Sequence, residues 1–301
     1  MFLKNLLVFS IVLLKFHNYK GCDDAPKKGS HSTNTAQQTE ASDNALPGYS
    51  LNEPQVIKLP GELNEISGIA YYPRDSSLFA IIDNDGLLFK IPLKRGFKTK
   101  YWRFDKRHDF EDIALHDTSF YVLISNGNIE KLHFQNNAFT KTVSSFSRTE
   151  GINEFESLYY DPSTSKLVML CKDCEQDKEN KKKSVTAFGV SPDSMTYTSD
   201  VFKIKTKAIL EKLDLEKLHL KPSAAAINPV TKELYVLASS NKLLVVLDAN
   251  GEFKNAYPLD HSVFKQPEGI TFSPSGDMII SNEAAENGPA NILIFKYQKT
   301  E

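Results

Sequence analysis

Ser67-Gly-Ile-Ala-Tyr-Tyr-Pro73 is the first of five segments of this 301-residue chain that align with one another without gaps. Each segment starts with a polar residue, continues with a short apolar run and carries Pro or Asp six positions after its start. The other four are Glu111-Asp-Ile-Ala-Leu-His-Asp117, Glu156-Ser-Leu-Tyr-Tyr-Asp-Pro162, Ser223-Ala-Ala-Ala-Ile-Asn-Pro229 and Glu268-Gly-Ile-Thr-Phe-Ser-Pro274. Successive starts are 44, 45, 67 and 45 residues apart. Since a four-stranded propeller blade takes about 40–45 residues, the repeat predicts an all-β, five-bladed β-propeller.

The last repeat is one strand short of a complete blade. After its first strand it supplies only two strand-like segments, residues 278–281 and 292–297. A further extended segment, residues 55–59, precedes the first repeat. We expect this N-terminal strand to complete the last blade, because joining the two ends of the chain closes the ring and removes the exposed sheet edges.

The 67-residue interval leaves a six-bladed propeller as the alternative. Two insertions account for its length: a charged loop at residues 175–183, and a short amphipathic helix within residues 207–220, where apolar residues recur at helical spacing. Too little sequence then remains for four more strands, which favours five blades.

The repeat starts resemble those of a known family. They read Glu65-Ile-Ser-Gly-Ile-Ala70, Asp109-Phe-Glu-Asp-Ile113, Glu154-Phe-Glu-Ser-Leu158, Lys221-Pro-Ser-Ala224 and Gln266-Pro-Glu-Gly-Ile270. In this order they look like the SdiA-regulated (YjiK-like) family of bacterial envelope propellers, over roughly residues 52–298. The resemblance implies the propeller fold and an envelope location, and it implies no activity.

The N-terminus has the features of an export signal. Lys4 precedes an apolar stretch, residues 6–14, of the length of a signal-peptide core. Gly21-Cys22 follows and resembles the lipobox of bacterial lipoproteins, in which the cysteine is acylated. We therefore expect lipidation at Cys22, with a plain secretory signal as the alternative.

These features predict three parts of the chain. Residues 1–22 are the signal peptide with its lipobox-like cysteine, residues 23–50 are a flexible linker rich in small polar residues, and residues 51–301 are the propeller domain. The expected location is the cell envelope, as a lipoprotein anchored to the cell membrane or the outer membrane, on its periplasmic or surface side. The membrane is then one partner, through the lipid.

Cys171 and Cys174 remain once Cys22 is set aside. This C-x-x-C pair could be a structural disulfide, two free thiols, a redox pair or half of a zinc site. No further soft ligands cluster nearby, and the pair follows a strand-like run rather than opening a helix. A structural disulfide or two free thiols are therefore favoured.

The charge balance narrows the range of other partners. Lys and Arg number 36 against 38 Asp and Glu, for a net charge of -2, whereas nucleic-acid-binding domains carry a clear basic excess. We expect no nucleic-acid partner, and an unidentified small-molecule or protein ligand. The chain also lacks the G-x-S-x-G, H-E-x-x-H and glycine-rich nucleotide-binding motifs, so no catalytic residue is assigned.

Blade topology brings distant residues together at one mouth of the central channel. The first strand of each blade leaves this rim and the second returns to it, so the strand starts and the second-strand ends converge. We expect Glu111, Glu156, Glu268, Asn126 and Asn282 to form an oxygen-rich metal site there. The remaining expected mouth residues are Ser67, Asp83, Asn84, Asp112, Ser223 and Glu283.

Calcium is the cofactor that this set of ligands predicts. Three glutamates on one narrow rim repel one another, and a hard cation with oxygen ligands would compensate their charge. The alternative is that the carboxylates cap strand starts or pair with Lys172. We accordingly expect a binding module with an acidic channel mouth. The competing class is a calcium-dependent hydrolase of the phytase-like esterase or lactonase type, and a serine-based enzyme ranks third.

Overall fold

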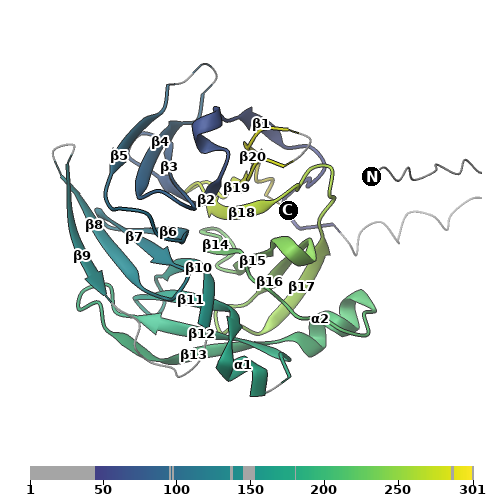
Figure 1. Ribbon diagram of the computed structural model, residues 1–301. Coiled ribbons are helices and arrows are strands. Elements are labelled where there is room, and N and C mark those ends of the chain that lie inside the picture. Colours follow the sequence, from purple (N-terminus) through teal and green to yellow (C-terminus); the bar gives the residue numbers. More distant parts are fainter. Residues whose placement is uncertain are drawn as a thin grey trace, which may run out of the picture. The chain divides into compact units, whose positions relative to one another are not determined.

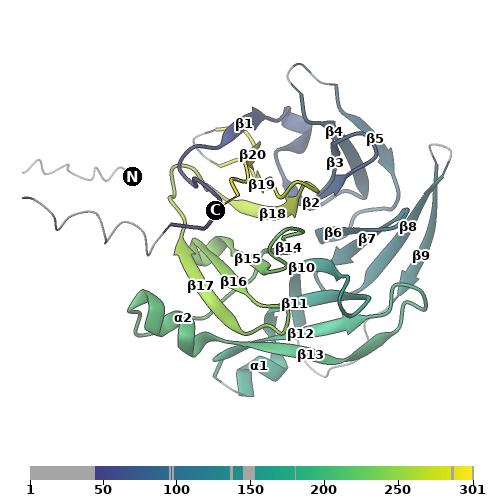
Figure 2. The same cartoon turned by 180° about the vertical axis from the view of Figure 1, so that it is seen from behind.

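The computed structural model describes residues 45–299, except residues 95, 97, 136–137, 145–152, 180 and 286–287. The chain divides into two units, Met1–Ser42 and Asp43–Glu301. The expected signal peptide, Cys22 and most of the expected linker lie outside the described residues. Within the second unit, the described residues form five four-stranded sheets around a common axis (Figures 1 and 2).

Four of the sheets, blades one to four, are each built from consecutive strands. Their strands are β2 (Ile66–Tyr72), β3 (Ser77–Ile82), β4 (Leu87–Pro92) and β5 (Lys100–Arg103); β6 (Phe110–His116), β7 (Ser119–Ile124), β8 (Ile129–Gln135) and β9 (Ala138–Ser144); β10 (Asn153–Asp161), β11 (Lys166–Cys174), β12 (Ser184–Val190) and β13 (Tyr197–Lys205); and β14 (Ala224–Ile227), β15 (Leu234–Ala238), β16 (Leu243–Leu247) and β17 (Phe253–Pro258). In each blade the first strand contains most of the repeated segment and lies nearest the axis (Figure 1). The five-bladed prediction is confirmed.

Blade five joins the two ends of the propeller. It contains β18 (Pro267–Phe272), β19 (Met278–Asn282) and β20 (Asn291–Phe295), and its outer strand is β1 (Gln55–Lys58). β1 and β20 run antiparallel, with Gln55 opposite Ile294 and Lys58 opposite Asn291. The pairing leaves no free edge on β20, as the sequence predicted.

The long third interval carries two helices rather than a sixth blade. α1 (Glu175–Glu179) lies where a charged loop was expected, and α2 (Thr206–Leu213) is shorter than the region expected to contain a helix. Asp177 is buried and accepts hydrogen bonds from the backbone N–H and the hydroxyl of Thr186, which fixes α1 against β12. Ile209 buries the apolar face of α2 in the core. Two single-turn 3-10 helices, η1 (Gly61–Leu63) and η2 (Ser239–Asn241), complete the described helices.

Neighbouring blades are in close contact at the axis. A Cβ on Gly68 of blade one would collide with the carboxylate and backbone of Asp112 in blade two, so only glycine permits this approach. Asp112 is 3% exposed and accepts hydrogen bonds from the N–H groups of Ile113 (2.8 Å) and, in blade three, Leu158 (2.7 Å). The expected place of Asp112 at the channel mouth is therefore wrong, because its side chain ties blade two to blade three inside the ring.

The expected linker ends too late, because residues 45–50 belong to the folded domain. Leu46 and Tyr49 are 3% and 7% exposed and pack into the core between blades four and five. The Tyr49 hydroxyl donates a hydrogen bond to the carbonyl of Gly276 (2.5 Å) and accepts one from the side chain of Asn228 (2.8 Å). This short N-terminal anchor precedes the closing strand β1.

Truncated chains should distinguish the contribution of the N-terminal anchor to stability from that of the closing strand β1. Compared with a chain that starts at residue 45, one that starts at residue 51 should lose about 3–5 kcal/mol of unfolding free energy, because it lacks the buried side chains of Leu46 and Tyr49. A chain that starts at residue 60 also lacks β1 and should no longer unfold cooperatively. Urea unfolding of the three chains measures both effects. Equal stability for starts at 45 and 51 would contradict the anchor, and equal stability for starts at 51 and 60 would contradict ring closure by β1.

Candidate acidic binding site

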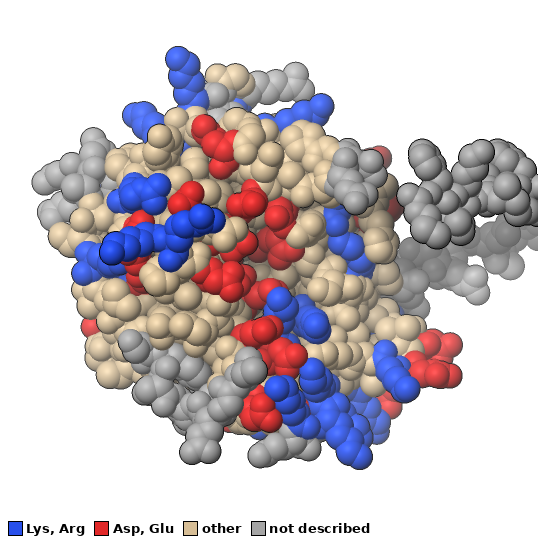
Figure 3. Space-filling model, in the orientation of Figure 1, with Lys and Arg blue, Asp and Glu red and all other residues tan. Residues whose placement is uncertain are grey.

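One end of the central channel opens into a cavity of about 400 Å³ with an acidic lining, here called the acidic mouth. Figure 3 shows Asp and Glu side chains gathered around the centre of this face. The lining combines first-strand starts, second-strand ends and the residues just before the first strands. It consists of Ser67, Asp83, Asp109, Glu111, Ser125, Asn126, Asn153, Glu154, Phe155, Glu156, Lys172, Ser223, Gln266, Glu268 and Glu283.

The three glutamates reach the mouth through the same irregularity of the backbone. Phe110 pairs with Ile124 and Asp112 with Leu123, so the register of blade two shifts at Glu111. Equivalent shifts occur at Glu156 and at Glu268. A β-bulge leaves one residue unpaired and can redirect its side chain. The bulges thus place one glutamate from each of three blades at the same opening.

The expected mouth residues divide into two groups. The first group lines the acidic mouth and consists of the three glutamates with Ser67, Asp83, Asn126, Ser223 and Glu283. Asn282 and Asn84 lie elsewhere, as does Asp112.

Asn282 does not belong to the site. Its side chain is fully buried, and its amide donates hydrogen bonds to the carbonyl of Val263 (3.0 Å) and the side chain of Asn291 (3.2 Å). Asn84 is not part of the lining, and its amide donates to Asp83 (3.1 Å). Asn282 is therefore not available as the metal ligand that the sequence predicted.

Two acidic residues of the mouth, Asp109 and Glu154, were not predicted from the sequence, and neither was Gln266. Each lies two positions before a repeat start. All five repeats carry a polar or charged residue at this position, and that periodic signal could have identified them.

The mouth carries a large excess of negative charge. Seven carboxyl groups line it, from Asp83, Asp109, Glu111, Glu154, Glu156, Glu268 and Glu283. Among the described residues that line it, Lys172 is the only Lys, Arg or His. The Lys172 ammonium contacts the Glu156 carboxylate. One ammonium thus faces seven carboxyl groups.

Burial and mutual repulsion raise the pKa values of these carboxyl groups. The pKa of Glu111 rises from 4.5 to about 9, because burial disfavours its charge and the carboxylates of Glu156 and Asp109 repel it. The pKa of Glu268 rises to about 8 through burial and through repulsion by Glu156 and Glu283. Burial and the neighbouring Asp109 carboxyl raise the pKa of Asp83 to about 6. The single lysine of the mouth therefore does not offset the repulsion among its carboxyl groups.

Hydrogen bonds between blades hold this rim in place. The N–H of Phe110 donates to the carbonyl of Asp83 (2.8 Å), and the N–H of Phe155 donates to that of Ser125 (2.8 Å). The Ser223 hydroxyl donates to the carbonyl of Pro267 (3.0 Å). The serine at the fourth repeat start therefore joins blades four and five.

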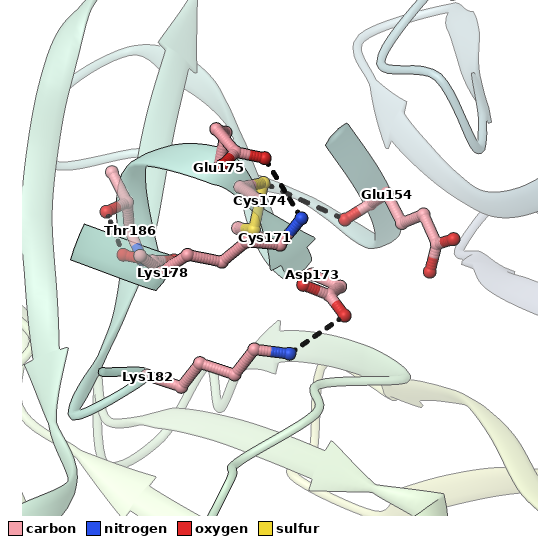
Figure 4. Close-up of a disulfide and its surroundings, with 9 residues drawn as sticks. Glu154, Cys171, Asp173, Cys174, Glu175, Lys178, Lys182 and Thr186 are labelled. Atoms are coloured by element: carbon pink, nitrogen blue, oxygen red, sulfur yellow. Dashed lines mark hydrogen bonds and ion pairs between the residues drawn. A yellow bond between two sulfur atoms is a disulfide. The ribbon is translucent and has the colours of Figure 1, made fainter. Parts of the chain in front are cut away.

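A disulfide joins Cys171 to Cys174 at the end of β11, beside the acidic mouth (Figure 4). Both cysteines are buried, which agrees with a structural role rather than a redox one. Lys172 lies between them in the sequence, and the sulfur of Cys174 lies 3.9 Å from the carbonyl oxygen of Glu154. The disulfide thus constrains the strand end that carries the ammonium group of the mouth.

The acidic groups do not form a compact metal-binding cluster. No three His, Cys, Asp or Glu side chains of the described residues are close enough together to hold one metal ion. The carboxyl groups are distributed around the 400 Å³ cavity instead, an arrangement that suits several separated positive charges.

Comparison with known protein families finds a match over most of the chain. A family model described as SdiA-regulated matches residues 44–287. No curated protein matches the sequence. No helix within the described part of the chain is long and apolar enough to span a membrane.

Several solved structures are similar to this chain. Glutaminyl cyclase from Myxococcus xanthus has a TM-score of 0.53 and 13% identity, over 82% of this chain and 98% of that chain. Virginiamycin B lyase from Staphylococcus aureus, in a catalytically inactive form with quinupristin, has a TM-score of 0.44 and 14% identity, over 80% and 69% of the two chains. The calcium-binding protein regucalcin from Agrobacterium tumefaciens has a TM-score of 0.46 and 10% identity, over 84% and 96%. At 13% identity, the likeness to the glutaminyl cyclase concerns the fold alone.

The raised pKa of Glu111 should make the protein less stable at alkaline pH. Between pH 4.5 and about 9 the folded state holds a proton on Glu111 that the unfolded state has lost. Unfolding free energy should therefore fall as pH rises through this range. Glu111→Gln should flatten this fall. At pH 9 the unfolding free energy of the variant should exceed that of the wild type by about 1–2 kcal/mol. Urea unfolding at pH 6 and pH 9 measures this, with Glu216→Gln on an exposed site outside the mouth as the control. An identical pH dependence of wild type and Glu111→Gln would contradict the expected charge repulsion.

Proposed function

The chain belongs to the SdiA-regulated family, and from this premise we propose that it is a β-propeller binding module whose acidic mouth takes a positively charged ligand. The observation that supports the proposal is seven carboxyl groups around one cavity with a single lysine. A cation that enters the mouth favours the ionised form of Glu111 and Glu268 and so offsets the repulsion that raises their pKa values.

The ligand class that fits best is an organic cation with two or more ammonium groups. Lys172 and Glu156 already form an ammonium–carboxylate pair within the mouth, which shows the chemistry that a ligand ammonium would repeat. The cavity volume of about 400 Å³ is within the range of small-molecule sites. Because the remaining carboxyl groups are spread over several blades, a ligand with separated charges can pair with more than one of them.

Calcium is the second candidate. Carboxylate oxygens and the side-chain oxygen of Asn126 are hard donors of the type that Ca²⁺ prefers. Calcium binding would require the side chains to move together, and Glu156 would have to leave Lys172 or be shared with it. The organic cation needs neither change and is therefore preferred.

The alternative class is a hydrolase that uses the acidic mouth with calcium. This class predicts turnover of phosphate-ester, carboxyl-ester or lactone substrates, with loss of turnover on chelation and in Glu156→Gln. A binding module predicts no turnover of these substrates under any metal condition. An assay of the purified protein with and without Ca²⁺ separates the two classes.

We also propose that the propeller is tethered to an envelope membrane through a lipid on Cys22. The support is the sequence Gly21-Cys22 after a signal-like apolar stretch, together with membership of the family. Under this proposal the propeller acts at a membrane surface without crossing it.

Binding of spermidine should depend on pH and on the mouth glutamates. The carboxyl groups of Glu111 and Glu268 must lose protons to pair with ammonium groups, so affinity should rise between pH 6 and about pH 9 with release of protons. Glu111→Gln and Glu268→Gln should each weaken binding about tenfold at pH 8, or about 1.4 kcal/mol.

Isothermal titration calorimetry in two buffers of different ionisation enthalpy measures affinity and proton release together. Glu216→Gln is the control and should bind like the wild type. Tighter binding of Ca²⁺ than of spermidine, lost in Glu156→Gln, would favour the second candidate. Affinities that stay constant with pH and in both mouth variants would refute a cation site at this mouth.

Cys22→Ser should release the protein from the membrane fraction. The substitution removes the thiol that carries the lipid, and we propose no other attachment. Fractionation of cells that produce the two forms, with immunoblotting, measures the distribution. Ser42→Ala, in the expected linker, is the control and should fractionate like the wild type. Unchanged membrane association of Cys22→Ser would contradict the lipid anchor.

A further inference from the structure

A second cavity, of about 500 Å³, opens at the other end of the same channel. It lies where the first strands end, whereas the acidic mouth lies where they begin. Strand β2, for example, runs from Ser67 at the acidic mouth to Tyr71 at this second cavity. The second cavity is here called the apolar mouth.

The fifth position of the repeat supplies the large side chains of the apolar mouth. It is occupied in the five blades by Tyr71, Leu115, Tyr160, Ile227 and Phe272, all of which line the cavity. Four of them are only partly buried, and Phe272 is buried. The charged residues in the described lining are Asp117 and Lys232, one of each sign, in turns after the strands. The wall is thus apolar and aromatic, with charges at its rim.

Contacts between blades fix the aromatic side of this wall. The rings of Tyr160 in blade three and His116 in blade two are stacked, with centroids 3.8 Å apart and an angle of 19° between them. The N–H of Tyr71 in blade one donates a hydrogen bond to the hydroxyl of Thr271 in blade five (3.1 Å). The cavity is therefore largely formed before a ligand arrives, as is usual for small-molecule sites.

The size of the cavity indicates what can fill it. A sphere of this volume has a wall of roughly 300 Å², whereas a stable protein interface buries about 800 Å² on each partner. The hollow is too small to hold a protein partner by itself, and its volume is that of a small organic ligand. Apolar lining that remains in contact with water is stabilised when such a ligand covers it.

We propose that the apolar mouth binds a small, uncharged and mainly apolar molecule. The ligand sits on the ends of the five innermost strands, against the stacked Tyr160 ring and the side chains of Leu115 and Ile227. The site is separate from the cation site in place and in chemistry, so the failure of one proposal does not affect the other.

Titration of the full-length protein with the neutral dye Nile red tests the proposal. The wild type should bind one dye molecule with enhanced fluorescence. Ile227→Glu places a charge in the wall and should weaken binding at least tenfold, because an unpaired charge beside an apolar ligand is unfavourable. Leu115→Gln, in another blade, should weaken it as well and serves if Ile227→Glu does not fold. Leu215→Glu, at a 44%-exposed site after α2, is the matched control and should bind like the wild type.

Three results would overturn the proposal. They are no fluorescence change with folded wild type, binding that the folded wall variants retain, and binding that Leu215→Glu loses equally. Size-exclusion chromatography of the same variants adds a fourth. If the wild type self-associates and the wall variants do not, a second copy of the chain covers this mouth instead of a small molecule.

Discussion

Pairing of β1 with β20 holds the ring closed, and both mouths exist only while it is closed. The five first strands come from sequence positions up to 201 residues apart (Ser67 to Glu268), and each mouth is lined by residues of all five blades. Antiparallel pairing at residues 55–58 brings these blades into one arrangement. The anchor at Leu46 and Tyr49 and the inter-blade carboxylate of Asp112 reinforce it. Stability and site geometry therefore depend on the same contacts.

One repeat produces two chemically different ends. Its first position carries Glu in three blades and Ser in two, and its fifth position carries a large apolar residue in all five. Since the first strands all leave the same rim, these two positions separate to opposite ends of the channel. One of these serines also has a structural use, because the Ser223 hydroxyl donates a hydrogen bond to the carbonyl of Pro267 in the neighbouring blade.

Repeat spacing was sufficient to predict the five blades, the closing strand and the placement of Glu111, Glu156 and Glu268 near one axis. It was not sufficient to predict which of two adjacent polar residues faces the mouth. In a strand, successive side chains point to opposite faces, so Glu111 lines the mouth while Asp112 points into the ring, and Glu283 lines it while Asn282 is buried. The bulges shift this alternation locally, and sequence periodicity does not reveal where they occur. The anchor was missed for a different reason: two apolar residues in a polar segment give no periodic signal.

The position of the N-terminal anchor determines how the propeller can be attached to a surface. Tyr49 bonds to Gly276 and Asn228, which lie close in sequence to Pro274 and Ile227 of the apolar mouth. At the other end of the domain, the N–H of Gln298 donates to the carbonyl of Gly48 (2.9 Å). Both ends of the propeller therefore emerge on the side of the apolar mouth. A biosensor chip coupled close to either end would present the acidic mouth to the flowing solution and would hold the apolar mouth toward the chip.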